Sequence, residues 1–572
     1  MKIFCKRNIT VYTIIAILVA ILAFEVGYCN TSVIEGIIKG TSYTYNFSLC
    51  RLIIYLILII IYISFKNKFI EKSIESFEKK EKRIVTYIVI VCSIIFSIIR
   101  ILKIFKYTEI GIIRTNIIYI IVSILTSLFV IYISNDIKKN VIVTACTLGI
   151  IFTFTTSFNH AIDEKKHFMS ALNVSFFNFD YVKNPITDSK IEQLPQITKF
   201  TNIDDFLKND YSSNVTDNVD MNDIPSTPAD YSVTTYLFAG VGIAIARILG
   251  GSIIDMYILG RVMNLVIYTI FIYLAISILP YKKNIFYIIA FMPFMLLLAS
   301  SYSGDGICLG MIYVFVAYCL NLHKQDKEIT LKQFLLLCFL YCIMILGKGT
   351  AYMAIGSIVF MLPLYRTIKK NKKYWTWMIV SAIIVVMIGI VFVLYMKDKK
   401  LSAPVDSRGG NNINAAEQLK VILTHPIFDI KLAVQHIKVT LLNFNWYSQL
   451  HQKTFFTENS SYVMFAMMLF ILYVSVTEDE YNFKLREKSI LIIAFLLAFG
   501  MSSAILYLTF TPVGVLYIAG YQGRYIFPLL PILLSCLSSN RLKYSKTEER
   551  NRNVAICSGI FLIIGLMQLI IV

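Results

Sequence analysis

Long apolar runs recur along the whole chain, and they constrain its fold more than any other feature. Two of them, Leu52–Ile63 and Met378–Leu394, contain no charged residue and no alternation of polar and apolar positions. Only helices and closed barrels satisfy every backbone N–H and C=O group in lipid. Continuous apolar runs favour helices over barrel strands. The sequence therefore predicts an all-α polytopic membrane protein.

The composition agrees with this prediction, because 57% of the 572 residues are hydrophobic. Soluble domains have about 45–50% apolar residues. We expect one large membrane domain with about 15 membrane segments, since one of the 16 apolar runs does not fit the alternation described below. The expected segments are roughly 9–28, 51–65, 84–104, 112–134, 141–158, 232–250, 253–280, 285–300, 306–321, 332–347, 350–365, 375–396, 461–476, 488–510, 524–539 and 553–571.

The net charge of +19 reflects basic residues that cluster between the apolar runs. Such clusters mark cytoplasmic loops, so we expect no nucleic-acid partner. Lys66–Arg83, Arg366–Lys373 and Arg541–Arg552 are assigned to the cytoplasm on this basis. The first apolar run lacks a small-residue cleavage site, which favours a retained signal anchor and a cytoplasmic N-terminus. We expect a multi-pass protein of the cytoplasmic membrane.

Alternation from this start places the larger loop of about 159–231 on the extracytoplasmic side, and a separate count back from the C-terminal half places a second larger loop, about 397–460, on the same side. Counts from the two ends of the chain disagree between residues 232 and 282, where two apolar segments lie but one crossing is needed. Segment 232–250 is short and ends in Gly250-Gly251. It is either a re-entrant or surface-lying helix, or the N-terminal count is wrong.

The first polar constellation follows the apolar run that ends near residue 158. In a helix, His160, Asp163, Glu164 and His167 share one face. A carboxylate at the lipid–water boundary can have a raised pKa and serve as a general base. The same four groups could hold a divalent cation. Ordinary charge pairs at a solvated helix start are the alternative.

Three further constellations lie at predicted extracytoplasmic turns. Asp305 lies between two apolar runs, where an acid can simply cap a helix. Lys348, between two glycines, can meet a lipid phosphate or snorkel to the membrane surface. Arg524, in Gly520–Pro528, can grip phosphate through its planar guanidinium or fix a helix end at the interface. Arg261 and Asn264, inside an apolar segment, favour a structural helix–helix role.

Four of these motifs together resemble a family of bacterial polytopic membrane proteins that is grouped with the GT-C glycosyltransferases. The resemblance covers roughly residues 139–572, and residues 1–138 are expected to be extra N-terminal transmembrane segments. The sequence departs from the family pattern at Ile162 and at Lys165-Lys166, which leaves the two carboxylates in place and changes the local turn. The motifs are Asp163-Glu164-x-x-His167-Phe168, Ser303-x-Asp305-Gly306, Gly347-Lys348 and Gly520-Tyr521-Gln522-Gly523-Arg524-Tyr525-x-x-Pro528. His425-Pro426 and Trp446 resemble the second outside loop of the same family.

The resemblance implies a GT-C-like helix bundle and an inverting glycosyltransferase that uses a polyprenyl-phosphate-linked sugar. The implied acceptor is a cell-surface glycan or lipid. Asp163 would be the catalytic base, with Glu164 as the second candidate. Lys348 and Arg524 would stabilise the leaving phosphate, and Asp305 would orient a sugar hydroxyl or a metal. We also assign His167, Gln522 and Tyr525 to the substrate-binding set.

Two other functions remain open at this point. A polysaccharide ligase or polymerase also acts on polyprenyl-linked glycan, and the length of the donor would separate it from a transferase. A transporter or flippase of lipid-linked saccharide would need charged residues along a path through the bilayer. Arg261 is the main charge within an apolar segment, which argues against transport.

Overall fold

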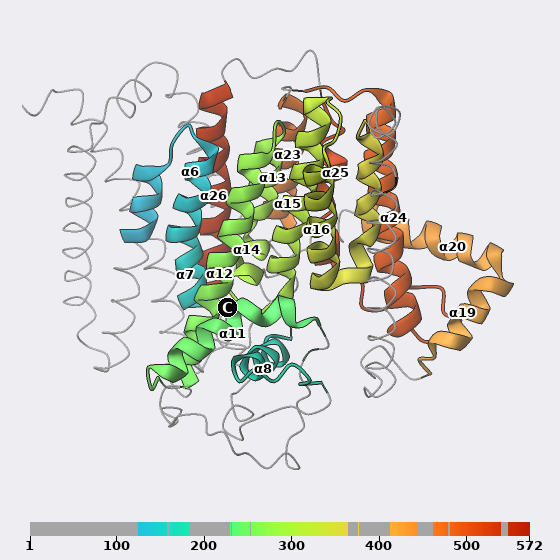
Figure 1. Cartoon of the computed structure of the whole chain (residues 1–572), viewed down its shortest axis with the longest axis horizontal. Coiled ribbons are helices and arrows are strands. Elements are labelled where there is room, and N and C mark those ends of the chain that lie inside the picture. Colours follow the sequence, from blue (N-terminus) through green and yellow to red (C-terminus); the bar gives the residue numbers. More distant parts are fainter. Residues whose placement is uncertain are drawn as a thin grey trace, which may run out of the picture.

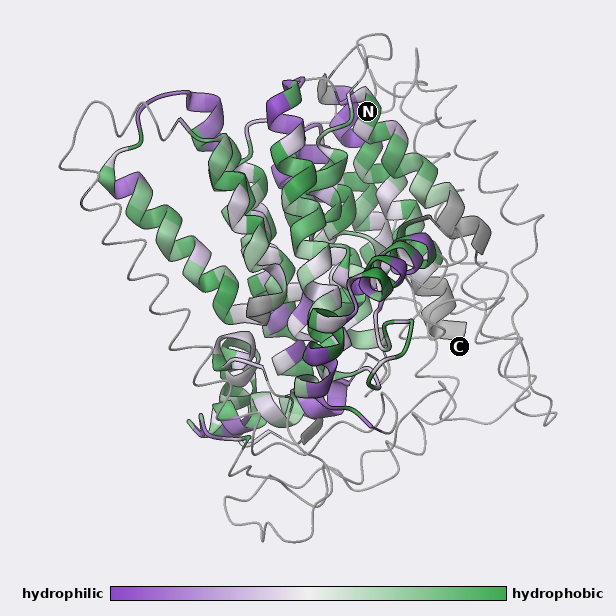
Figure 2. Ribbon diagram, turned by 90° about the vertical axis from the view of Figure 1, so that its right-hand side faces the viewer, coloured by the Kyte–Doolittle hydropathy of each residue, from purple (hydrophilic) through white to green (hydrophobic). Residues whose placement is uncertain are grey.

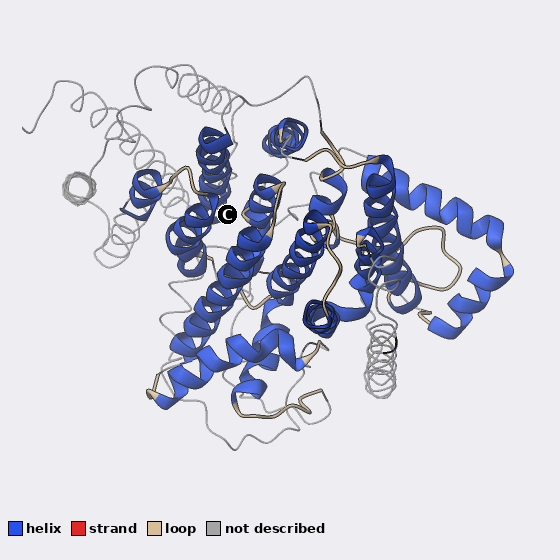
Figure 3. Cartoon of the chain, turned by 45° about the horizontal axis from the view of Figure 1, so that its top comes forward, coloured by secondary structure: helices blue, strands red, loops and turns tan. Residues whose placement is uncertain are grey.

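The structure is a computed structural model, and the residues that it describes form helices, turns and loops without a strand (Figure 3). The apolar segments expected at 9–28, 51–65 and 84–104, most of 112–134, and nearly all of 375–396 lie outside these residues. The described residues are 124–156, 163–182, 231–251, 253–363, 412–442, 461–478, 481–538 and 547–571, with single residues at 161, 229 and 376.

Four helical runs in the described part of the chain are long and apolar enough to cross a membrane. Apolar residues fill the middle of the helix bundle, and hydrophilic residues gather at its two ends (Figure 2). This distribution confirms a multi-pass helical membrane protein, while the total of about 15 segments stays a prediction. The four runs are Ile137–Phe154, made of α6 (Ile137–Thr144), η2 (Ala145–Gly149) and α7 (Ile150–Thr155); α12 (Ile253–Ile278); α15 (Gly304–Gln325); and α24 (Leu485–Thr509).

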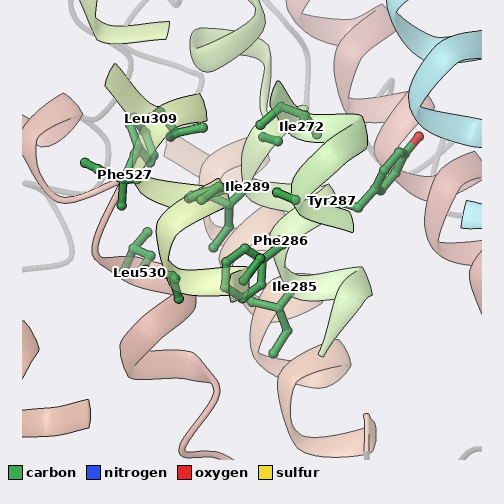
Figure 4. Packing of buried hydrophobic residues seen from close by; sticks show 14 of the residues in the cluster. Ile272, Ile285, Phe286, Tyr287, Ile289, Leu309, Phe527 and Leu530 are labelled. Atoms are coloured by element: carbon green, nitrogen blue, oxygen red, sulfur yellow. The ribbon is translucent and has the colours of Figure 1, made fainter. Parts of the chain in front are cut away.

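Two short helices, α13 (Lys283–Ala290) and α14 (Pro293–Ala299), form the centre of the bundle. Pro293 begins α14, because its ring fits the first helical turn and it has no N–H to donate. Nearly every residue from 284 to 299 is buried. Their side chains pack with Ile272 of α12, Leu309 of α15 and the segment around Phe527 (Figure 4).

Four further helices surround this centre (Figure 1). The 3₁₀ helix η4 turns back along α16, since Tyr341 Oη donates to the carbonyl oxygen of Met353 at 2.8 Å. Expected segments 332–347 and 350–365 are therefore two packed helices joined at Lys348-Gly349. The four helices are α16 (Leu331–Lys348), η4 (Gly349–Met361), α23 (Ser461–Thr477) and α26 (Thr547–Ile571).

The apolar segment 524–539 differs from the expectation of a continuous helix. It begins with a 3₁₀ turn, η9 (Gly523–Tyr525), and contains one five-residue helix, α25 (Leu530–Leu534). Pro528 and Pro531 explain the break, because a proline removes a helical hydrogen bond and clashes with the preceding turn. The chain thus remains irregular inside the bundle.

The ambiguous segment 232–250 forms α11 (Val233–Ile248), which packs on α8 (Glu164–Ser175) and on the first half of α12. Its Gly242 lies directly against the backbone of Leu259, so a Cβ at this position would lie 2.5 Å from that carbonyl oxygen. Figure 1 shows α11 beside α8 at the lower end of the bundle. This arrangement agrees with the first alternative, a helix that stays at one end.

The opposite end of the bundle is held by a buried polar cluster. Lys282 Nζ donates to the carbonyl oxygens of Glu478, of Leu537 at 2.8 Å and of Ser475 at 3.3 Å. The Glu478 carboxylate accepts from the side-chain amide of Asn284 at 3.0 Å. Chain segments around Lys282, Glu478 and Leu537 thus meet at this end of the bundle, and the side of the membrane on which it lies stays a prediction.

Two consecutive helices leave the bundle beside α24 and form an arm (Figure 1). Asn414 caps the first helix by accepting from Ala416 N at 3.0 Å, and Pro426 begins the second. His425-Pro426, noted in the sequence, is therefore the bend of the arm, while Trp446 lies outside the described residues. The helices are α19 (Ala415–Thr424) and α20 (Pro426–Ile437), followed by the π-turn η6 (Lys438–Leu442).

Candidate functional site

Asp305 lies in the first turn of α15, where Ser303 caps the helix by accepting from Asp305 N at 3.2 Å. The preceding Gly304 packs against Thr235 of α11, and a Cβ there would lie 2.5 Å from Thr235 Cγ2. The glycine therefore allows α11 to approach the start of α15. The Asp305 side chain is buried at this helix start.

Arg524 forms an ion pair with this carboxylate, with 3.2 Å between Arg524 Nη1 and Asp305 Oδ2. Both side chains are buried, and the guanidinium carbon lies 5.4 Å from the ring centre of Tyr525. The structure thus joins two of the four motifs, Ser303–Gly306 and Gly520–Pro528, through one ion pair.

Two polar atoms beside this pair have no hydrogen-bond partner among the described residues. They are Arg524 Nε and Gln522 Oε1, and both are buried. Buried polar atoms in native proteins are usually satisfied, so each such atom calls for an explanation. A bound ligand with an acceptor for Arg524 and a donor for Gln522 would satisfy both.

His167, in α8, is also buried at this end of the bundle. Its Nδ1 lies 2.7 Å from Tyr236 Oη, and its ring stacks on Tyr231 with 5.4 Å between centres. The Tyr231 ring also lies within 4.0 Å of the position of a Cβ on Gly304. Tyr231 therefore lies between His167 and the start of α15.

The Gly347-Lys348 motif ends α16 beside the same helix start. Thr235 Oγ1 donates to the carbonyl oxygen of Gly347 at 3.2 Å, and Gly347 packs against Met311 of α15. Thr235 therefore contacts both Gly347 and Gly304, the residue before Asp305. The side chain of Lys348 lies outside the described residues.

Glu164, the second candidate base, has a different environment. Its two carboxylate oxygens accept from Arg261 Nε at 2.8 Å and from Arg261 Nη2 at 2.9 Å. Tyr302 N donates to the same carboxylate at 3.2 Å, and Arg261 also donates to the carbonyl oxygen of Thr156 at 2.7 Å. Both charged side chains are buried. The geometry agrees with the structural role that the sequence favours for Arg261.

Asn264, the companion of Arg261 in α12, donates to the carbonyl oxygen of Ser301 at 2.9 Å. It thereby fixes the turn between α14 and α15, just before the first turn of α15 that contains Asp305. Like Arg261, it joins two helices, which is the structural role that the sequence favours.

Asp163 precedes α8 in a left-handed backbone conformation, with φ at 56°. Asp and Asn tolerate this conformation better than most residues. Asp163 is only partly buried, and its carboxylate does not cap the helix, although Asp is a preferred capping residue. Its carbonyl oxygen accepts from His167 N at 3.1 Å. Asp163 thus lies one helical turn from His167.

The metal site predicted from the sequence, at His160, Asp163, Glu164 and His167, is not formed by those of its residues that the structure describes. Glu164 has both oxygens on Arg261, and His167 has Nδ1 on Tyr236. No group of three or more His, Cys, Asp or Glu residues that could hold a metal occurs among the residues that the structure describes. His160 lies outside them.

Sequence reasoning therefore named His167, Asp305, Gln522, Arg524 and Tyr525 in a region where the structure brings them near one another. It missed Tyr231 and Tyr236, which link His167 to the others. Their only sequence signal is their position after the long acidic loop, at the start of an apolar run.

The comparisons with known proteins agree with the fold. A family described as a predicted membrane protein, DUF2142, matches residues 146–533. No curated protein and no solved structure matches the chain. Because the match spans more than half of the sequence, the chain belongs to the DUF2142 family of membrane proteins.

Proposed function

We propose that this protein is a membrane glycosyltransferase that moves a sugar from a polyprenyl-phosphate-type donor to a glycan or lipid acceptor on the extracytoplasmic face. The observation that carries the proposal is the buried ion pair of Asp305 and Arg524. Within and beside this pair, Arg524 Nε and Gln522 Oε1 have no hydrogen-bond partner among the described residues. A lipid phosphate has the negative charge and the acceptor oxygens that could bind Arg524 Nε.

The guanidinium can bind a phosphate without releasing Asp305. Asp305 occupies Nη1, while Nε points elsewhere and has no partner among the described residues. An arginine has five N–H donors in a fixed plane, so it can serve two anions at once. Asp305 would then hold the guanidinium in place, which fixes the direction of Nε before a ligand arrives.

In the proposed reaction, the Asp163 carboxylate takes the proton of the acceptor hydroxyl. The hydroxyl oxygen attacks the anomeric carbon from the side opposite the phosphate, and the bond from that carbon to the phosphate oxygen breaks. The electron pair remains on the leaving phosphate, whose charge Arg524 and Lys348 stabilise. The reaction inverts the anomeric centre, and water-poor surroundings strengthen the electrostatic stabilisation.

The contacts of Glu164 favour Asp163 as the base. A carboxylate held by two hydrogen bonds from a buried arginine has little freedom to move toward a substrate. Glu164 and Arg261 would act as positioning residues that hold the start of α8 against α12.

The transport alternative is weakened by the same contacts. Arg261 would be the main charge along a path through the bilayer, yet it is buried against Glu164 near one end of α12. A ligase or polymerase would use the same groups with a longer donor, so the length of the donor remains the discriminating measurement.

The test uses the full-length protein in its native host and purified in lipid. Asp163→Asn and Arg524→Ala should each abolish one surface glycan modification, and the purified variants should form no glycosidic product from a polyprenyl-phosphate sugar. Lys324→Ala, an exposed charge at the opposite end, should leave both readouts unchanged. Normal glycan and normal product in both site variants would refute the proposal, as would translocation without a new glycosidic bond.

A further inference from the structure

The arm formed by α19 and α20 carries a stripe of exposed apolar side chains that the proposed reaction does not use. Their spacing of three or four residues places them along one side of each helix. They are between 47% and 75% exposed, which is unusual for large aliphatic residues on one continuous surface. The arm stripe consists of Leu419, Leu423, Ile427, Ile430 and Val434.

The other side of the arm is fixed to the bundle. Leu432 and His436 are buried, and His436 Nε2 lies 2.9 Å from Ser503 Oγ of α24. Gln418 Oε1 accepts from Gly514 N at 2.9 Å. In α20, Leu432 and His436 lie roughly opposite Ile430 and Val434 at 100° per residue. The stripe therefore points away from the protein.

The position of the arm along the axis of α24 indicates which part of the bilayer the arm stripe contacts. Lys484, at the start of α24, lies at the charged end of the bundle, and Ser503 lies 19 residues later. At about 1.5 Å per residue this separation is about 28 Å, close to the roughly 30 Å thickness of a hydrocarbon layer. The arm thus meets α24 at the opposite boundary of that layer.

The intervening part of α24 has the surface expected of a helix in lipid. Ile493, Leu496 and Leu497 are 47% to 51% exposed on it. The stripe continues this apolar surface outward at the level where acyl chains meet headgroups. The arm also carries Glu417, Lys420 and other polar residues, the composition of a helix lying in the interface.

We propose that the arm lies in the plane of the membrane interface, with its stripe inserted among the acyl chains of the lipid leaflet at the candidate-site end. This proposal concerns a contact with bilayer lipid and does not depend on the proposed reaction. His436 also packs against Tyr521, with 4.7 Å between ring centres, and Tyr521 packs against Tyr525. The arm would therefore hold the Gly520–Tyr525 turn at interface depth.

The test is photo-crosslinking of the full-length protein in nanodiscs made of phosphatidylethanolamine and phosphatidylglycerol. Ile427 and Ile430 are replaced, one at a time, by p-benzoylphenylalanine. Lys431 and Gln435, exposed on α20 beside the stripe, are the matched control positions. Adducts are identified by intact mass and by fragment mass after irradiation.

Acyl-chain adducts at Ile427 and Ile430, several-fold above those at Lys431 and Gln435, would support the proposal. Equal lipid yields at all four positions, or no lipid adduct, would overturn it. Crosslinks from the stripe to a second copy of the chain would also overturn it, because the stripe would then be a protein interface. Retention of a monodisperse nanodisc peak shows that each variant is folded.

Discussion

The buried pair of Glu164 and Arg261 should be essential to stability and dispensable to chemistry. Glu164→Ala would leave the buried guanidinium of Arg261 without its carboxylate, although neutral partners such as the carbonyl oxygen of Thr156 remain. Arg261→Ala would leave the Glu164 carboxylate with the N–H groups of Tyr302 and Ala161. Either variant leaves one buried charge without its counter-ion.

The expected magnitude follows from this burial. Removing one partner of a buried ion pair typically costs about 3–5 kcal/mol, because the remaining charge keeps its desolvation penalty. The pair has two short hydrogen bonds, of 2.8 and 2.9 Å, and both side chains are almost inaccessible. We therefore expect each single variant to fall in this range, with Glu164→Gln intermediate because it keeps one acceptor oxygen.

The measurement is a double-mutant cycle on purified full-length protein, unfolded by detergent titration. The double variant Glu164→Ala/Arg261→Ala removes both charges and should be less destabilised than the sum of the single variants by about 1–3 kcal/mol. Asp163→Asn is the matched control, because Asn also tolerates the left-handed conformation of this position. It should change the free energy of unfolding by less than about 0.5 kcal/mol.

Two results would refute this reasoning. Additive single variants would mean that the two side chains do not stabilise each other in the folded protein. A stable Glu164→Gln variant that lacks glycosyltransfer, with an active Asp163→Asn variant, would make Glu164 the base instead.

Three further predictions follow from other contacts. Burial lowers the pKa of His436 to about 4, whereas the unfolded residue titrates near about 6.5. The stability that comes from burying neutral His436 should therefore be fully present above about pH 6.5 and should fall, by on the order of 3 kcal/mol, as the pH decreases toward 4. His436→Gln should flatten this dependence in pH-dependent melting. Gly304→Ala should destabilise by about 1–3 kcal/mol through its contact with Thr235 Cγ2, and added Thr235→Ser, which removes that methyl, should restore the melting temperature. Lys282→Met should lower the melting temperature by leaving three carbonyl oxygens without their donor, while product formed per folded molecule stays unchanged.

The membrane class could be predicted because a long continuous apolar run satisfies its backbone hydrogen bonds in lipid by forming a helix. The irregular path through residues 524–539 could not be read from hydropathy alone, which does not register Pro528 and Pro531. The position of α11 needed the contact between Gly242 and Leu259, since an apolar helix looks alike in sequence whether it crosses lipid or packs on protein.

The site shows a similar division. Residue type predicted that Asp305 and Arg524 suit a polar site, and the structure joins them as a pair. Residue type could not tell Asp163 from Glu164, because the difference is the partner Arg261, almost 100 positions away in the sequence. Tyr231 and Tyr236 were missed for the same reason, since their role depends on lying next to His167.

The polar contacts at the two ends of α12 have a consequence for the choice of lipid. From Arg261 to Ile278 the helix rises about 26 Å, and Lys282 lies in the turn beyond. Both charges are bound to protein groups and cannot slide along the helix. The bundle is therefore matched to one acyl-chain length, and shorter or longer lipids impose hydrophobic mismatch, which the helices relieve by tilting. Tilting would change the depth of the Asp305–Arg524 pair relative to the headgroups.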